Sequence, residues 1–382
     1  MLMHRHRLEE AERRTLAPYA AFADASRGRQ HPEAESAYRT AFQKDRDRVI
    51  HTSAFRRLEY KTQVFVNYEG DYYRTRLTHT LEVAQVARSV ARALGLNEDL
   101  AETVALAHDL GHPPFGHAGE HTLDRLAKEH GGFDHNRQSL RIVTELERRY
   151  PAFAGLNLTW ETLEGIMKHE TEYDVPDARW DAEARPSLEA QVVNVADELA
   201  YNAHDLDDGL RSGHLQPTQV AAVPVIGRLM HRLAIDPARF DNRARYALVR
   251  DLLGEMIDDT IAHTHAAIEA AGIESVDDVR AHPDILVGHG PALAAELAAL
   301  KRFLYDELYR HHRQIRMTRK ADHILERLYV AYVQRPEMLP PDVRREAERL
   351  GAERAVVDYL AGMTDRYATD EYRRLFDPTW LT

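Results

Sequence analysis

Cysteine is absent from this chain of 382 residues. Its absence excludes disulfide bonds, thiolate zinc sites and a cysteine nucleophile, so any metal has to be held by His, Asp or Glu. Long apolar runs are also missing. No run approaches the roughly 18 residues that a membrane span needs, and the N-terminal stretch MLMHRHRLEEAERR lacks the apolar core of a signal peptide. We therefore expect a cytoplasmic protein with no membrane partner.

The sequence also lacks an excess of positive charge. Its 50 Lys and Arg residues are outnumbered by 62 Asp and Glu residues, which gives a formal net charge of −12. This balance argues against broad electrostatic binding of nucleic acid, although it leaves room for a local basic pocket around a phosphorylated small molecule. The hydrophobic share of 44% and the charged share of 29% are typical of a globular protein.

Stretches that favour β-strands are scarce, and helical periodicity dominates. Residues 62–66 are β-prone and a turn follows at 69–71, so we predict at most one short β-hairpin. The fold class is therefore all-α, with a loop at 170–185 and a single domain over residues 1–382, which divides into a core at 35–215 and a C-terminal helical extension at 216–382. Helices are predicted over residues 34–55, 77–94, 98–110, 116–129, 137–149, 160–169, 187–208, 224–233, 242–271, 291–311, 319–334 and 341–359.

Histidine and aspartate recur on the apolar faces of three predicted helices. His79 shares its face with Val83 and two later valines, and His108 ends a similar face with Asp109 beside it. Asp197 lies on a third apolar face with no Lys or Arg at the same spacing, and a buried carboxylate without a partner is costly unless it binds a metal. Two imidazoles and two carboxylates leave coordination positions open, and Mn²⁺, Mg²⁺, Fe²⁺, Zn²⁺ or Co²⁺ could accept such ligands.

This order of ligands resembles the HD superfamily of metal-dependent phosphohydrolases at His79, His108, Asp109 and Asp197. The surrounding motifs FRRLEYKTQVF, RTRLTHTLEV, HDLGHPPFGHAGE, FDHNRQS and DELAYNAHDLDD are similar to the short bacterial form of the dGTPase family, over about residues 35–215. The resemblance implies an HD helical bundle that hydrolyses dGTP or other deoxynucleoside triphosphates to the deoxynucleoside and inorganic triphosphate. It also implies Mn²⁺ or Mg²⁺ as the first metals to consider, and a homo-oligomer, with a hexamer among its forms.

A second constellation follows the Gly/Pro turn within residues 108–120. His117 and Glu120 stand one helical turn apart, so the carboxylate can orient the imidazole and raise its basicity. Water attack at the α-phosphorus expels a 5′ alkoxide, a poor leaving group that needs a proton in the transition state. We assign that role to His117, with Glu120 beside it. His112 is a further candidate for contact with the phosphates.

Candidate substrate residues lie close to the metal ligands in the sequence. Arg76 precedes His79 by three residues on nearly the same helical face, where its guanidinium suits a phosphate. Tyr201 and Asp205 continue the four-residue spacing of Asp197, and the resemblance implies that they flank the deoxyribose. Gln63 matches a family position that contacts sugar or base. The alternatives are a surface role for Arg76 and a core role for Tyr201.

One position departs from the family's vertebrate relative, in which a phosphate-binding lysine follows the last aspartate ligand. Here Glu198 follows Asp197, so the triphosphate has to be met differently, and the allosteric sites of that relative are not carried over. The basic cluster Arg316, Arg319 and Lys320, with Lys301 and Arg302 upstream, is a weak candidate for the β- or γ-phosphate.

Two other functions stay open at this point. One is an HD-type nucleotidase or phosphodiesterase that acts on other nucleotides, and the other is a nucleotide-sensing oligomer without turnover. Residue chemistry assigns no role to His135, Asn136 or His169, and it does not indicate which base is preferred.

Overall fold

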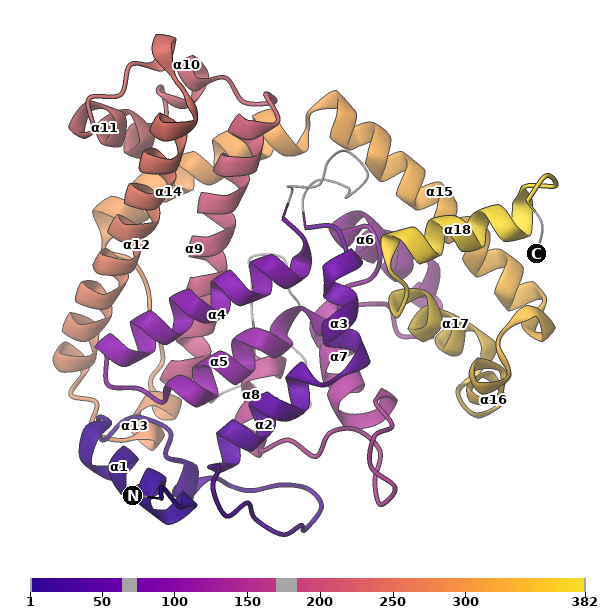
Figure 1. Cartoon of the computed structure of the whole chain (residues 1–382), viewed down its shortest axis with the longest axis horizontal. Helices are drawn as coiled ribbons and strands as arrows, with labels where there is room; N and C mark the ends of the chain where they lie inside the picture. The colour runs from indigo at the N-terminus through magenta and orange to yellow at the C-terminus, as the bar shows by residue number, and fades with distance from the viewer. Residues whose placement is uncertain (1, 64–73, 170–183, 381–382) are drawn as a thin grey trace. The chain divides into compact units, whose positions relative to one another are not determined.

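The computed structural model describes residues 2–63, 74–169 and 184–380, and these residues form helices joined by turns, with no β-strand among them (Figure 1). The all-α prediction is confirmed. The body of the predicted hairpin and most of the predicted loop at 170–185 lie outside the described residues; at the base of the hairpin, Thr62 and Thr75 form an isolated antiparallel bridge. Among the described helices, none is both long and apolar enough to cross a membrane.

The described chain packs as two compact units, each assembled from three segments. The first unit consists of Met1–Val49, His79–Leu106 and Asn157–His311, and the second of Ile50–Thr78, Ala107–Leu156 and His312–Thr382. The helices of the first unit are α1 Arg5–Thr15, α2 Ala41–Ile50, α4 Arg76–Ala93, α5 Glu98–Ala107, α8 Trp160–Met167, α9 Leu188–Arg211, α10 Pro217–Val220, α11 Pro224–Arg232, α12 Asn242–Ala271, α13 Val276–Ala281 and α14 Pro291–Leu304. Of these helices, the first three residues of α4 and the last residues of α2 and α5 belong to the second unit.

Helix α9 is central to the first unit and packs against α8, α12 and α14 (Figure 1). Its partner α12 buries one side chain nearly every four residues, from Leu248 through Leu252 and Met256 to Ile268, as the spacing of one helical face requires. Burial of each Leu, Met or Ile contributes about 1.5–3 kcal/mol. The helix that carries Asp197 therefore packs against a helix with one continuous buried face.

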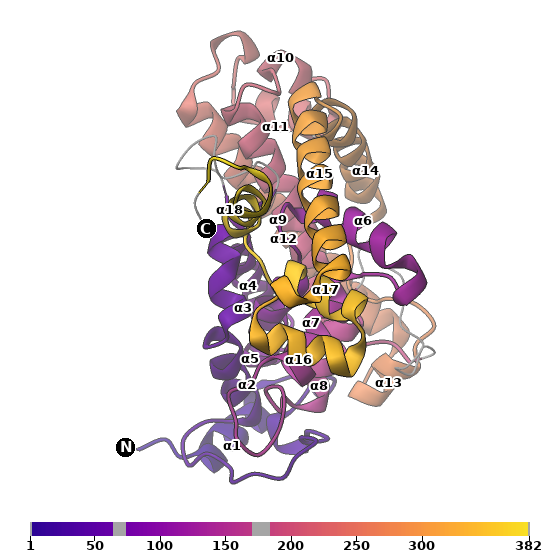
Figure 2. The ribbon, with the colours of Figure 1, turned by 90° about the vertical axis from the view of Figure 1, so that its right-hand side faces the viewer.

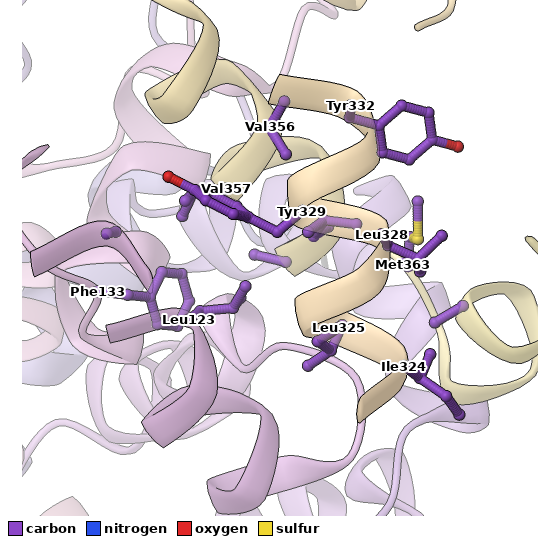
Figure 3. Close-up of a cluster of buried hydrophobic side chains, with 14 of the residues drawn as sticks. Leu123, Phe133, Ile324, Leu325, Leu328, Tyr329, Tyr332, Val356, Val357 and Met363 are labelled. Atoms are coloured by element: carbon purple, nitrogen blue, oxygen red, sulfur yellow. The ribbon is translucent and has the colours of Figure 1, made fainter. Parts of the chain in front are cut away.

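The second unit has its own hydrophobic core, built around one long helix. Helix α15 packs against α6, α17 and α18 (Figure 2), and its Leu325, Leu328 and Tyr332 meet Leu123 and Val357 in the cluster drawn in Figure 3. The helices of this unit are α3 Ser53–Arg57, α6 Gly116–Ala127, α7 His135–Arg141, α15 His312–Gln334, α16 Pro341–Leu350, α17 Ala352–Ala361 and α18 Asp365–Phe376.

Several predicted helices differ from the observed ones in their bounds. The predicted helix at 34–55 is two shorter helices, because Thr52 accepts a hydrogen bond from the Phe55 amide at 3.0 Å and so begins a new helix. The predicted helix at 341–359 is divided at Gly351, whose φ of +93° lies in the region that favours glycine. Helix α15 begins seven residues before the predicted start, and α1 and α18 were not predicted.

Candidate active site

In the first unit, α4 and α9 bring two of the predicted metal ligands together. His79 Nε2 lies 2.8 Å from Asp197 Oδ1, and His169, which follows the end of α8, places its Nε2 3.6 Å from Asp197 Oδ2. Both histidines are about 1% exposed. The carboxylate of Asp197 thus meets an imidazole on each oxygen, and His169, which sequence reasoning left without a role, is one of them.

A second layer lies behind His79 in the same unit. His204 is seven residues after Asp197, two helical turns along α9, and its Nδ1 lies 3.5 Å from His79 Nδ1. Its Nε2 lies 3.1 Å from Glu82 Oε2, one turn after His79 on α4. Sequence reasoning missed Glu82 and His204, although their spacings of three residues from His79 and seven residues from Asp197 could have drawn attention to both.

The predicted sugar residues also lie on α9. Tyr201 stacks on Tyr309 with ring centroids 5.9 Å apart and an interplanar angle of 19°. Asp205 is 1% exposed. On the same helix, Glu198 forms an ion pair with Lys301 of α14 at 3.0 Å. The residue that follows Asp197 is therefore paired with a cation from another helix.

In the second unit, the sequence around His108 forms a tight turn. Helix α5 ends at Ala107, and residues 108–111 continue as a 3₁₀ turn, because Pro113 and Pro114 follow and cannot extend a helix. Gly111 admits no side chain, since a Cβ there would stand 2.1 Å from the His135 carbonyl oxygen. Ser139 joins the turn to α7: its Oγ accepts from the Gly111 amide and donates to the His108 carbonyl, both at 2.8 Å.

Asp109 is the anionic centre of this half of the candidate site. Its Oδ1 accepts a hydrogen bond from Arg76 Nη1 at 3.0 Å and lies 3.2 Å from His112 Nε2 and 3.5 Å from His108 Nε2. Burial by itself raises the pKa of Asp109, but the neighbouring charge of Arg76 and the two histidines outweigh it and hold that pKa well below its usual range. Asp109 is therefore ionised.

Two buried groups of this half have hydrogen-bonding capacity that the described residues leave unused. Asp109 Oδ2 has no donor among them, and Arg76, which is 2% exposed, has no acceptor for Nε or Nη2. Buried polar atoms are ordinarily paired, so a cation at the carboxylate and an anion at the guanidinium would each complete the pairing. The residues therefore fit a metal ion and a phosphate.

Two histidines contact the carboxylate of Glu120, and a third packs against both of their rings. Glu120 Oε2 is 3.3 Å from His117 Nδ1, and its Oε1 accepts from the His135 amide and lies 2.8 Å from His135 Nδ1. His112 stacks on His135 with centroids 3.9 Å apart and meets His117 edge to face at 5.4 Å. Ligand atoms of His112, His117 and Glu120 lie within 4.8 Å of one another, so this group could also hold a metal.

The protonation states follow from these contacts. Burial raises the pKa of Glu120, but the charge of His135 and the hydrogen bonds from both histidines hold it well below its usual range. For His112, burial and then the charges of Arg76 and His135 lower the pKa well below its usual range, so this imidazole is neutral. His117 is about half exposed. The cluster therefore combines a fixed anion, a neutral imidazole and an accessible imidazole.

Local sequence explains how His117 and His135 are aimed. Phe115 has a φ of +66° and donates its amide hydrogen to Asp365 Oδ1 at 2.8 Å, which turns the chain into α6 just before His117. Asp134 caps α7, accepting from the Arg137 amide at 2.8 Å, and so fixes His135 at the first helical residue.

The remaining candidates lie apart from these contacts. Gln63 is the last described residue before the gap, and its Oε1 is buried with no partner among the described residues. Arg316, Arg319 and Lys320 are exposed on α15, as a solvated face would be. A cavity of about 1020 Å³ in the second unit is lined by Lys61 and by residues of α3, α7, α16 and α17, and no candidate site residue lines it.

Comparison with known families matches two parts of the chain. Residues 76–202 match the HD domain, and residues 287–374 match the phosphohydrolase-associated domain. The first match spans His79, His108, Asp109 and Asp197.

Full-length relatives are similar over nearly the whole chain. A deoxyguanosinetriphosphate triphosphohydrolase-like protein of Geobacter sulfurreducens is 50% identical over 375 residues, which cover 97% of each chain. Proteins of the same name are 53% identical in Azoarcus sp., over 94% of this chain and 96% of the relative, and 49% identical in Caulobacter vibrioides, over 94% and 96%.

Proposed function

This chain belongs to the family of deoxyguanosinetriphosphate triphosphohydrolase-like proteins with an HD domain, and we propose that it hydrolyses deoxynucleoside triphosphates to the deoxynucleoside and inorganic triphosphate. The observation that carries the proposal is the buried pair of Arg76 and Asp109, which keeps hydrogen-bonding capacity for an anion on one side and a cation on the other. A phosphohydrolase needs both in one place. The relatives' name makes dGTP the first substrate to test.

We propose that His79, His108, Asp109 and Asp197 ligate one divalent metal ion. Support comes from the HD-domain match that spans all four, from the 2.8 Å approach of His79 to Asp197, and from the unsatisfied Oδ2 of Asp109. A bound Mn²⁺ or Mg²⁺ would polarise a phosphoryl oxygen and lower the pKa of water, and Fe²⁺, Zn²⁺ or Co²⁺ would suit the same ligands.

Arg76 and His112 are the proposed phosphate contacts. The guanidinium of Arg76 is held by Asp109 through one nitrogen, so Nε and Nη2 are left to bind a phosphate in bidentate fashion. His112 is neutral, and its buried Nδ1 has no partner among the described residues. Its Nε2 faces the ionised Asp109 carboxylate at 3.2 Å, so the proton of the neutral ring lies on Nε2, and Nδ1 would meet a phosphoryl oxygen through a bridging water.

His117 is the proposed proton donor to the departing 5′ oxygen. It is accessible, and Glu120 lies against its Nδ1, so the opposite nitrogen is the one that would face a substrate. His135 fixes the other oxygen of Glu120 through two contacts and thereby limits rotation of the carboxylate. A positioned acid of this kind contributes roughly 10²–10⁴-fold to rate.

Tyr201, Asp205 and Gln63 are the proposed contacts to deoxyribose and base. Tyr201 is braced by Tyr309, so a ring held against the 2′ carbon would exclude an added hydroxyl. Asp205 continues the α9 face of Asp197 and would accept from the 3′ hydroxyl. Discrimination against ribonucleotides would then come from shape on one side and a hydrogen bond on the other.

Product analysis tests this function. The protein is incubated with Mn²⁺ and each deoxynucleoside triphosphate in turn, and the products are separated by anion exchange. Equal amounts of triphosphate and deoxynucleoside are expected. Pyrophosphate with a monophosphate, free phosphate, or hydrolysis confined to deoxynucleoside monophosphates would assign the chain to the nucleotidase or phosphodiesterase alternative. Nucleotide binding without turnover would indicate a sensing protein.

The expected oligomer has its own measurement. We propose a homo-oligomer, with a hexamer among its forms, and light scattering on the eluted protein gives its mass directly. A monomer at all protein concentrations would contradict this part of the proposal.

A further inference from the structure

Three side chains in the first unit form a row of polar contacts that ends at the proposed metal ligand His79. Glu82 Oε2 lies 3.1 Å from His204 Nε2, and His204 Nδ1 lies 3.5 Å from His79 Nδ1, with the two rings nearly perpendicular at 85°. The other nitrogen of His79, Nε2, faces Asp197. Both imidazoles are buried, whereas Glu82 is 42% exposed.

The hydrogen-bonding chemistry of these groups determines which nitrogen of each ring carries a proton. A carboxylate without a proton only accepts hydrogen bonds, so a His204 ring with one proton carries it on Nε2, which faces Glu82. Its Nδ1 is then an acceptor. His79 Nδ1 must supply the hydrogen of the contact between the two rings, and a neutral imidazole with its proton on Nδ1 has a lone pair on Nε2.

The lone pair on Nε2 is what metal ligation requires. Without this proton placement, the proton could sit on His79 Nε2 and donate to Asp197, 2.8 Å away, and that proton would compete with a metal for the same two atoms. With it, a nitrogen lone pair and a carboxylate oxygen face each other, an arrangement that favours a bound cation.

We propose that Glu82 and His204 are positioning residues that hold His79 in the tautomer whose Nε2 can ligate the metal. This inference rests on the proposed metal site and extends it to two residues that lie one and two contacts behind the ligand. Neither residue touches the substrate in this account, and their effect is on metal affinity.

Metal binding to the purified, metal-free protein tests the inference. Free Mn²⁺ is titrated by electron paramagnetic resonance, and circular dichroism verifies that each variant is folded. His204→Leu removes the acceptor and is expected to weaken Mn²⁺ binding roughly 10- to 100-fold, the usual effect of losing such an outer partner. His204→Asn places a carbonyl oxygen near the position of Nδ1 and is expected to restore most of the affinity.

A double-variant comparison tests whether Glu82 acts through His204. Glu82→Gln is expected to weaken Mn²⁺ binding in the otherwise unchanged protein, because a neutral amide can either donate or accept and no longer selects one tautomer. In the His204→Leu background the same change should have no further effect. Glu98→Gln is the control: Glu98 is a partly buried carboxylate of α5 that pairs with Arg92, and this variant should bind Mn²⁺ as the unchanged protein does.

A spectroscopic readout observes the tautomer itself. In ¹⁵N-histidine-labelled protein, the His79 signals, identified by their loss in a His79 variant, are expected to show a protonated Nδ1 and an unprotonated Nε2. A proton on Nε2, or equal Mn²⁺ affinity in His204→Leu, His204→Asn and the unchanged protein, would overturn the inference. If one of these results is obtained and the unchanged protein still binds Mn²⁺ and hydrolyses dGTP, only this inference fails. If the unchanged protein binds no Mn²⁺, the proposed metal site fails as well.

Discussion

Glu120 accepts from two histidines and from the His135 amide, and these contacts are formed by residues three and fifteen positions away in the sequence. The first spacing is one helical turn, so the pairing with His117 could be predicted from the sequence. The second exists only because α7 folds back against the turn at 108–111. Sequence reasoning therefore named His135 without a role, and the structure supplies its partner.

Replacement of Glu120 by Gln is predicted to lower kcat by roughly 10²-fold while KM changes little, because proton transfer acts in the transition state and not in substrate binding. The pKa of Glu120 lies well below its usual range, so the carboxylate is ionised near neutrality and no titration of Glu120 should appear there in the pH–rate profile. Steady-state kinetics with dGTP measures both parameters. A raised KM with an unchanged kcat would instead place Glu120 in substrate binding.

Lys61 gives a prediction about stability and pH. Burial, followed by the charges of Arg57 and Arg76, lowers the pKa of Lys61 to about 7, and its ammonium group donates to the carbonyl oxygens of His112 and Ala361. An unfolded lysine keeps its proton up to about pH 10.4, so folding releases a proton above about pH 7 and stability rises with pH in this window.

Lys61→Met abolishes that titration. Between about pH 7.5 and 9.5 the free energy of unfolding of the unchanged protein should rise relative to that of Lys61→Met by roughly 1 kcal/mol per pH unit. Urea unfolding at several pH values measures the difference. Parallel pH dependences of the two proteins would show that the pKa of Lys61 is not lowered in the folded state.

At the scale of helices, local end signals decided which bounds could be predicted. Helix α12 runs over the predicted residues, since Asp241 caps its first turn and Gly272, with φ of +63°, ends it. Helix α15 was predicted to begin seven residues late, because the charged stretch His312–Thr318 has little apolar periodicity and is mostly exposed. Residues 64–73 lie outside the described part of the chain, so the predicted hairpin stays a prediction.

Close approach of α5 and α8 in the first unit gives a prediction about packing. A Cβ on Gly165 would lie 2.6 Å from a methyl group of Val104. Alanine is about 1 kcal/mol better than glycine within a helix, but overpacking costs about 1–3 kcal/mol, so Gly165→Ala should destabilise the protein. Urea midpoints should show that Val104→Ala relieves much of this effect in the double variant. A stabilised Gly165→Ala protein would contradict the observed packing.

At the scale of the whole molecule, the sequence predicted one domain whose core precedes a helical extension, and that division stays a prediction. The packing of the described residues follows another order, in which each of two units draws on three separate segments. Apolar periodicity identifies which face of a helix is buried but not which other helix covers it. The partners of α15, which include α6 about two hundred residues earlier, could not be inferred from one sequence.

Metal binding is predicted to stabilise the folded chain as a whole. An ion present at 100 times its dissociation constant adds about 2.7 kcal/mol to the free energy of unfolding if it binds only the folded state. Mn²⁺ should therefore raise the apparent Tm, and a chelator should reverse the rise. Asp197→Ala should lose this response, while the Glu98→Gln control keeps it. An equal rise in Asp197→Ala would locate the bound metal elsewhere.

The reaction itself is tested most directly by hydrolysis of dGTP in ¹⁸O-water with Mn²⁺, followed by ³¹P nuclear magnetic resonance. Attack of water at the α-phosphorus predicts inorganic triphosphate with one ¹⁸O on a terminal phosphorus and unlabelled deoxyguanosine, and no product from the Asp197→Ala protein. Deoxyguanosine monophosphate with pyrophosphate, or ¹⁸O in the 5′ hydroxyl of deoxyguanosine, would contradict the proposed function.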